Sequence, residues 1–341
     1  MDHRPWLKNY PPGIPANIDH TKYETLVDFL KECFEKYSAN TAFECMGKKL
    51  TYAETDRLST QFAAYLHSRG LAPGDRIALM MPNLLQYPIA VFGALKAGLI
   101  IVNTNPLYTP REMLFQFEDS GVRAIVILEN FAANLESIIG KTKIDTVILA
   151  SVGEMLGSIK GSVVNFAVRY IKRMVPKYHL TNTVTFKYAL SEGKRFTIKE
   201  FSNCAEDVII HQYTGGTTGI SKGAMLTNAN LVANMIQIRT WMQSYLVEGK
   251  EITLSPLPMY HIFAFAVNCL AMLSYGAHTV LVTNARDLSS VVKEFKRNKI
   301  SLMTGLNTLF NALLNNEDFR KCDFSPLKIT VGGGMAIQKA V

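Results

Sequence analysis

Hydrophobic positions in the first 150 residues of the chain follow two alternating spacings. Some stretches repeat apolar residues every three or four positions, as in a helix, and others are short runs of β-branched or aliphatic residues, as in a buried strand. This pattern predicts helices over 52–69, 85–97 and 110–120, and strands over 76–80, 100–103 and 124–128. Strands that alternate with helices of this length are typical of parallel β-α-β units.

The same alternation returns after residue 207. It predicts strands over 208–212, 252–254 and 279–282, and helices over 227–243, 263–275 and 288–296. We therefore expect an α/β fold made of two lobes of parallel β-α-β units. The expected division is a first lobe over 1–152, an inserted basic segment over 153–203 and a second lobe over 204–341.

Composition narrows the class of protein. Of the 341 residues 48% are hydrophobic and 19% are charged, which excludes disordered, collagen-like and coiled-coil chains. The five cysteines are widely spaced, with neither a CxxC pair nor histidines at zinc spacing, so no disulfide framework or structural metal is expected. The N-terminus lacks the apolar stretch of a secretory signal. These features favour a cytoplasmic protein.

Positive charge is concentrated in one part of the inserted segment. Between Met155 and Leu180 there are five basic residues and no acidic one, so +5 of the net charge of +8 lies there. Apolar residues in the same stretch recur every three or four positions, which predicts an amphipathic helix on an anionic membrane surface. A solvated surface helix is the alternative. Nucleic acid is not expected as a partner, because aromatic residues do not alternate with the basic ones.

A loop rich in glycine and threonine gives the clearest chemical signal. Residues 213–223 read YTGGTTGISKG and lie between the β-branched run 208–210 and a short extended run over 223–226. Glycines allow backbone N–H groups to approach an anion, threonine hydroxyls add donors and a lysine adds charge. The loop is not a Walker A motif, because no Gly-Lys-Ser/Thr follows at the required spacing. The residues predicted to hold a polyphosphate are Thr214, Gly215, Gly216, Thr217, Thr218, Gly219 and Lys222.

This loop resembles the signature of the adenylate-forming superfamily, an aromatic-Thr-Ser-Gly-Thr-Thr-Gly-x-Pro-Lys-Gly sequence. The chain differs from it at Gly215, which replaces Ser, and at Ser221, which replaces Pro. Four further stretches look like the bacterial long-chain fatty acyl-CoA synthetases: WLKNYP at 6–11, LMMPNLLQYP at 79–88, NPLYTPRE at 105–112 and TGLNTLFNALLNN at 304–316. The resemblance covers essentially the whole chain.

The resemblance implies ATP-dependent activation of a long-chain fatty acid to acyl-AMP, followed by transfer to coenzyme A. It assigns catalytic roles to Lys222 and His261, with Thr214 as the contact of Mg²⁺. It places the adenine against Gly332, Gly333 and Gly334, and the acyl chain near Tyr260, Phe265 and Gly305. Each assignment has a structural alternative. His261 and Phe265 could be ordinary core residues, and the glycines at 332–334 could form a turn that binds no ligand.

Relatives in this superfamily continue with a magnesium-binding Glu, a ribose-binding Asp and a mobile small domain that carries a catalytic Lys. We therefore expect the chain to be the N-terminal part of such an enzyme, inactive alone and peripheral on the inner face of the cell membrane. A homodimer is left open. Two rival functions are a ligase for aryl or shorter-chain acids and a non-catalytic module that binds acyl chains or docks to membranes.

Overall fold

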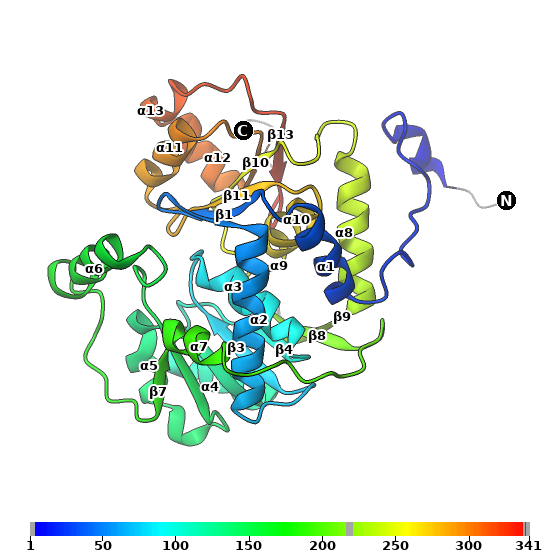
Figure 1. The fold of residues 1–341 in the computed structure, drawn as a ribbon. Coiled ribbons are helices and arrows are strands. Elements are labelled where there is room, and N and C mark those ends of the chain that lie inside the picture. Colours follow the sequence, from blue (N-terminus) through cyan, green and yellow to red (C-terminus); the bar gives the residue numbers. More distant parts are fainter. Residues whose placement is uncertain (1–3, 216–220, 337, 339–341) are drawn as a thin grey trace.

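The computed structural model describes residues 4–215, 221–336 and 338, and these residues form two β-sheets with helices around and between them (Figure 1). The larger sheet has the strand order β7-β6-β5-β3-β4-β8-β9, in which only the β8–β9 pair is antiparallel. Its strands are β3 (Arg76–Met80), β4 (Ile100–Asn103), β5 (Val122–Leu128), β6 (Thr146–Ala150), β7 (Thr183–Thr185), β8 (Val208–Thr214) and β9 (Lys222–Thr227).

The smaller sheet has the order β13-β12-β10-β11-β1-β2, in which only the β1–β2 pair is antiparallel. Its strands are β1 (Thr41–Cys45), β2 (Lys48–Thr51), β10 (Ile252–Ser255), β11 (His278–Leu281), β12 (Leu302–Gly305) and β13 (Ile329–Gly332). The sheets therefore do not follow the expected division at residues 152 and 204. Strands β1 and β2 join the later sheet, and β8 and β9 extend the earlier one, because a hydrophobic pattern marks strands without marking their pairing partners.

Eleven helical segments lie between residues 5 and 193 of the described chain. They include η1 (Pro5–Asn9), α1 (Leu26–Lys36), α2 (Tyr52–Ser68), α3 (Gln86–Lys96), α4 (Pro110–Ser120), η2 (Glu129–Phe131), α5 (Ala132–Glu136), η3 (Ile139–Lys141), α6 (Ser158–Phe166), η4 (Ala167–Ile171) and α7 (Phe186–Gly193). The later helices are α8 (Asn228–Met242), α9 (Ile262–Ala264), the π-helical η5 (Phe265–Ala271), α10 (Met272–Ser274), α11 (Leu288–Arg297), α12 (Asn307–Leu314) and α13 (Glu317–Arg320).

Helix α3 occupies the centre of the molecule. All its residues from Gln86 to Leu95 are buried, as expected for a helix that is apolar on every side. Its Phe92 ring packs against Phe34 of α1 and Phe43 of β1, and these residues belong to one hydrophobic core that contacts both sheets. The two sheets are thus held in a fixed relation by a shared core.

The predicted α/β class is confirmed, and three predicted elements coincide with β3, β4 and α4. Helix α8 begins one residue after its predicted start because Thr227 is its N-cap, with the side chain accepting from the Asn230 N–H. The predicted helix over 263–275 is divided into α9, η5 and α10. Within the described part of the chain, no helix has both the length and the apolarity needed to cross a bilayer.

Candidate functional site

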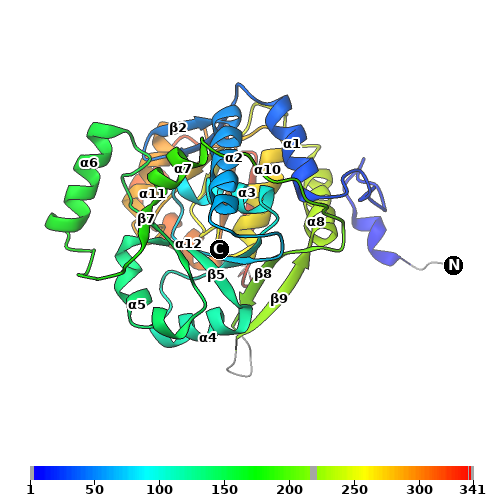
Figure 2. The ribbon, with the colours of Figure 1, turned by 60° about the horizontal axis from the view of Figure 1, so that its bottom comes forward.

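The described ends of the predicted phosphate loop belong to a β-hairpin formed by β8 and β9 (Figure 2). Thr214 pairs with Lys222 across the hairpin, and the Ser221 hydroxyl donates to the Thr214 carbonyl at 2.8 Å. Thr214, Gly215 and Lys222 are exposed. Four other predicted residues, Gly216, Thr217, Thr218 and Gly219, lie outside the described residues.

Tyr213 fixes the hairpin below this loop. Its side chain is buried, and its hydroxyl donates to the carboxylate of Asp119 in α4. Burial raises the pKa of the phenol, so Tyr213 stays protonated as a donor. The ring covers Gly223 so closely that a Cβ there would lie 2.9 Å from Cζ of Tyr213, so this position requires glycine. These contacts therefore fix the base of the hairpin, although Thr214 and Lys222 at its end are exposed.

A chain of buried polar groups connects the hairpin to the segment before His261. The Tyr87 hydroxyl of α3 lies 2.7 Å from Asn103 Oδ1 and 2.8 Å from the Met259 carbonyl. The Asn103 amide donates to Gln212 Oε1 at 3.3 Å, and Gln212 Nε2 donates to the Tyr260 carbonyl at 3.2 Å. Buried amides held in this way fix the loop relative to both sheets.

Asn83 attaches the same loop from the other side. Its amide nitrogen donates to the carbonyls of Ser255 and Leu257 at 3.0 and 2.9 Å, and its oxygen accepts from the Met259 N–H at 2.8 Å. Sequence reasoning missed Asn83, Asn103 and Gln212 as positioning residues. The available signal was a polar amide at the end of an apolar run, as in Ile100–Asn103.

His261 follows this loop and is the N-cap residue of α9. Its ring packs beside the Tyr260 ring, with centroids 4.7 Å apart and an interplanar angle of 42°. Partial desolvation lowers the pKa of His261 below its ordinary value of 6.5, so the imidazole is neutral at pH 7. A neutral imidazole offers one donor and one acceptor to a bound group.

The residues after His261 line an apolar pocket of about 570 Å³. Its walls come from α8, the 262–267 segment and β13, and include Ile238, Trp241, Phe263, Ala266 and Val331. Phe265, the predicted acyl contact, is fully buried in the core, and Phe263 and Ala266 face the pocket instead. Sequence reasoning also missed the wall that α8 contributes. Its signal was the apolar spacing of Ile238, Trp241 and Met242.

The predicted adenine glycines lie at the edge of this pocket. Gly333 packs on the Phe263 ring, where a Cβ would come within 2.9 Å of Cζ, and Gly334 has a φ of +74°. Gly332 pairs with Gly305 across β12 and β13, and Gly305 packs against the Phe310 ring. The structure therefore brings the glycine turn, Gly305 and the pocket wall together, with Tyr260 and His261 on the segment that leads into it.

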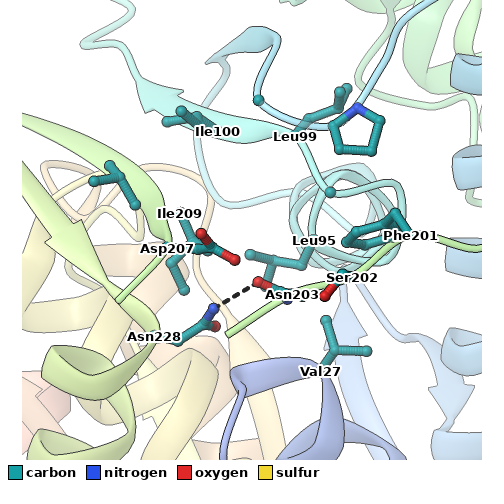
Figure 3. Close-up of a pocket in the computed structure, with 14 residues that line it drawn as sticks. Val27, Leu95, Leu99, Ile100, Phe201, Ser202, Asn203, Asp207, Ile209 and Asn228 are labelled. Carbon is teal, nitrogen blue, oxygen red and sulfur yellow. Dashed lines mark hydrogen bonds between the residues drawn. The ribbon is translucent and has the colours of Figure 1, made fainter. Parts of the chain in front are cut away.

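A second pocket, of about 310 Å³, lies at the opposite edge of the larger sheet, where β4 and β8 begin (Figure 3). Polar groups of its wall bond to one another: Asn228 Nδ2 donates to Asn203 Oδ1 at 2.9 Å, and Asp207 accepts from the Cys204 N–H at 2.7 Å. Ligands of open α/β sheets bind outside the carboxyl ends of the strands. The hairpin edge is therefore the better candidate site.

The side chains that commonly bind metal ions are dispersed in the described part of the chain. Over residues 4–215 and 221–336, no group of three or more His, Cys, Asp and Glu side chains is arranged to hold a metal ion. The exposed Thr214 hydroxyl at the end of β8 remains the predicted magnesium contact. Magnesium often binds through one protein oxygen, substrate phosphates and waters, which is compatible with a single hydroxyl.

Comparison with known proteins places these features in context. The family described as AMP-binding enzyme matches residues 30–341. The chain is 49% identical over 337 residues to the long-chain-fatty-acid–CoA ligase of Salmonella typhimurium, covering 98% of this chain and 60% of that protein. It is 30% identical over 344 residues to the ligase of the same name from Bacillus subtilis, covering 99% of this chain and 60% of that protein. The resemblance inferred from the motifs is confirmed.

Solved structures show the same fold. A long-chain-fatty-acid–CoA ligase from Archaeoglobus fulgidus superposes with a TM-score of 0.77 at 21% identity, over 97% of this chain and 61% of that one. The anthranilate–CoA ligase AuaEII, solved with anthranoyl-AMP, gives a TM-score of 0.78 at 20% identity, over 94% of this chain and 57% of that one. The chain thus spans about 60% of the length of the curated relatives it matches.

Proposed function

The chain belongs to the AMP-binding enzyme family, and from this membership we propose that it provides the nucleotide and acyl sites of a long-chain fatty acid–CoA ligase. The supporting observation is a set of contacts: Gln212 of the hairpin that ends at Lys222 bonds to the Tyr260 carbonyl, and Gly333 of the glycine turn packs on Phe263, which lines an apolar pocket of about 570 Å³. Its volume falls within the usual range for small-molecule sites.

In the proposed reaction the fatty acid carboxylate attacks the α-phosphate of ATP, forming acyl-AMP and releasing pyrophosphate. The thiol of coenzyme A then displaces AMP to give the thioester. Lys222 neutralises charge on the phosphates, and N–H groups of the loop donate to their oxygens. Thr214 would contact a Mg²⁺ ion, which would supply further charge neutralisation on the phosphates when bound. Catalysis then depends on positioning and electrostatics, without an enzyme nucleophile.

The acyl chain is proposed to lie against Ile238, Trp241 and Phe263, with its carboxylate toward His261. Because the pKa of His261 is lowered, the neutral imidazole would donate one hydrogen bond to the carboxylate. The apolar wall supports a long alkyl chain over a polar or short acid. The rival ligase for aryl or shorter acids predicts the opposite order of affinity.

Binding and turnover test this proposal separately. Titration of the chain with a fluorescent fatty acid, displaced by oleate, decanoate or benzoate, should give the tightest displacement with oleate. Pyrophosphate release and thioester formation should be low in this chain. Both should rise at least a thousandfold when it is joined to the remaining part of the Salmonella relative, which adds the segments expected to complete the site. Preference for benzoate would support the aryl rival, and no turnover in the joined protein would support a non-catalytic module.

Three finer points belong to the same proposal. The magnesium requirement is tested by chelation in the turnover assay, and a homodimer by light scattering. Reversible attachment to an anionic membrane surface from the cytoplasmic side is the third, and it suits an enzyme whose substrate partitions into lipid.

A further inference from the structure

Helix α6 and η4 form an arm at the periphery of the molecule, and Figures 1 and 2 both show it beside the main body. We propose that the outward face of this arm, made of Ile159, Val163, Phe166 and Tyr170, is a docking surface that inserts into an anionic lipid bilayer. The inference rests on the proposed function for its purpose, but its test is vesicle binding, which requires no ligase activity.

One face of the arm is fixed to the body by residues four positions apart. Gly161 lies so close to Gly153 that a Cβ on Gly161 would be 2.3 Å from the Gly153 carbonyl oxygen. Asn165 accepts from the Gly153 N–H at 2.7 Å and donates to the Ser151 hydroxyl at 2.9 Å. Residues spaced in this way share one side of a helix, so the orientation of the arm is defined.

Arg169 continues this inner face. Its guanidinium pairs with the carboxylate of Glu129, which is only 3% exposed, and Nε lies 3.1 Å from both carboxylate oxygens. The sequence pattern grouped Arg169 with the lipid-facing cations. In the structure it compensates a buried carboxylate, so it attaches the arm to the body and is not counted toward lipid binding.

The opposite face exposes large apolar side chains. Ile159 is 83% exposed, Val163 64%, Phe166 58% and Tyr170 65%. The Phe166 and Tyr170 rings contact each other, with centroids 5.2 Å apart. A helix of a water-soluble protein normally buries such a stripe against the core, but here the tether residues hold it outward. The stripe is therefore available to an apolar phase.

Charge selects the occupant of this face. Lys172, Arg173 and Lys177 follow the stripe and are exposed, and no acidic residue lies between Met155 and Leu180. An anionic bilayer attracts these cations and accepts the apolar stripe, whereas a second copy of the arm would bring like charges together. The charge pattern thus favours a lipid surface over self-association.

The experiment measures flotation of the purified chain with vesicles of phosphatidylcholine alone or with 30% phosphatidylglycerol. We expect binding to the anionic vesicles that weakens with salt. The variant V163S/F166S/Y170S should bind at least tenfold more weakly, and K172E/R173E about fivefold or more per reversed residue. The matched control V247S/L314S replaces side chains that are 56% and 51% exposed elsewhere, and it should bind like the parent. Circular dichroism checks that each variant is folded.

Fluorescence locates the inserted residues independently. In a W6F/W241F background, F166W should shift its emission to the blue and be quenched by brominated lipid, whereas L314W should do neither. Equal flotation of the parent and the apolar triple variant would overturn the proposal. So would light scattering that shows a dimer lost in the same variant together with no vesicle binding, because a second copy would then be the occupant.

Discussion

The two ends of strand β8 differ in how their polar groups are used. At the amino end, Asn228 is fully buried and bonds to Asn203, to the Cys204 carbonyl and to the Leu26 N–H. At the carboxyl end, Thr214 and Lys222 are exposed beside a turn rich in glycine. The same sheet thus has, at one end of β8, polar side chains that bond within the protein and, at the other end, the exposed residues Thr214 and Lys222. The volume of a pocket alone therefore does not show whether the pocket binds a ligand or is only a gap in the packing.

The first prediction concerns a variant at the amino end of β8. Asn228→Ala should lower the free energy of unfolding by about 3 kcal/mol, because it leaves the Leu26 N–H and the Cys204 carbonyl buried without partners. Urea denaturation measures this change. Asn203→Ala, which removes only one of these bonds, should cost about 1 kcal/mol. Equal costs for the two variants, or weaker nucleotide binding by folded Asn228→Ala, would contradict the assignment of this pocket to structure.

The second prediction concerns a variant at the carboxyl end of β8. Lys222→Ala should weaken nucleotide binding by about ten- to a hundredfold, the effect of one charge-assisted phosphate contact of roughly 1.5 to 3 kcal/mol. Unfolding should be unchanged, since the side chain is exposed. Titration with a fluorescent ATP analogue measures the affinity, and Lys250→Ala removes another exposed lysine as the control. A loss of fatty acid affinity with unaltered nucleotide binding would show that the phosphate assignment is wrong.

A third variant sharpens the comparison by changing the pocket near the glycine turn. Gly333→Ala places a Cβ 2.9 Å from the Phe263 ring, so the ring must move into the pocket that it lines. We expect fatty acid affinity to fall about fivefold, an effect of roughly 1 kcal/mol from overpacking. Gly140→Ala is the matched control, because nothing lies within 4 Å of its Cβ. Unchanged displacement by oleate would place the acyl chain elsewhere.

The smallest expected effect concerns pH. Burial lowers the pKa of His261 in the folded chain below 6.5, so the unfolded chain takes up this proton first as the pH falls. Stability should therefore decrease from pH 6.5 downward, until the folded pKa is reached. His261→Gln should make this decrease shallower, and His179→Gln at an exposed position is the control for replacing a histidine. Melting temperatures between pH 8 and 5 measure both, and identical curves for parent and His261→Gln would contradict the prediction.

Much of the fold was predictable because buried parallel strands are runs of β-branched and aliphatic residues. Strands β3 and β4 match their predicted bounds for this reason. The pairing of β1 with β11 was not predictable, since it joins residues more than 230 positions apart. The hydrogen-bonded pair of Asn103 and Gln212 is likewise a product of strand order, with partners more than 100 positions apart.

The apolar pocket beside α8 shows a different limit of prediction from sequence. Phe265 was the predicted acyl contact because the resemblance places an aromatic gate to the acyl tunnel at this position, with a core phenylalanine as the alternative. In the structure this stretch enters the π-helical η5, in which the wider turn changes the face on which successive side chains lie. Phe263, in α9, lines the pocket, whereas Phe265, the first residue of η5, is buried in the core. The helical spacing of apolar residues in the sequence does not show where an α-helix changes to a π-helix.

The arm and the apolar pocket lie on opposite sides of the body, as the places of α6 and α8 in Figures 1 and 2 show. A molecule anchored through α6 would hold the α8 side away from the bilayer. Under the proposed function, fatty acid would then reach the pocket only after leaving the lipid. Anchoring would thus raise the local supply of substrate by shortening its diffusion path, although the pocket itself would not contact the bilayer.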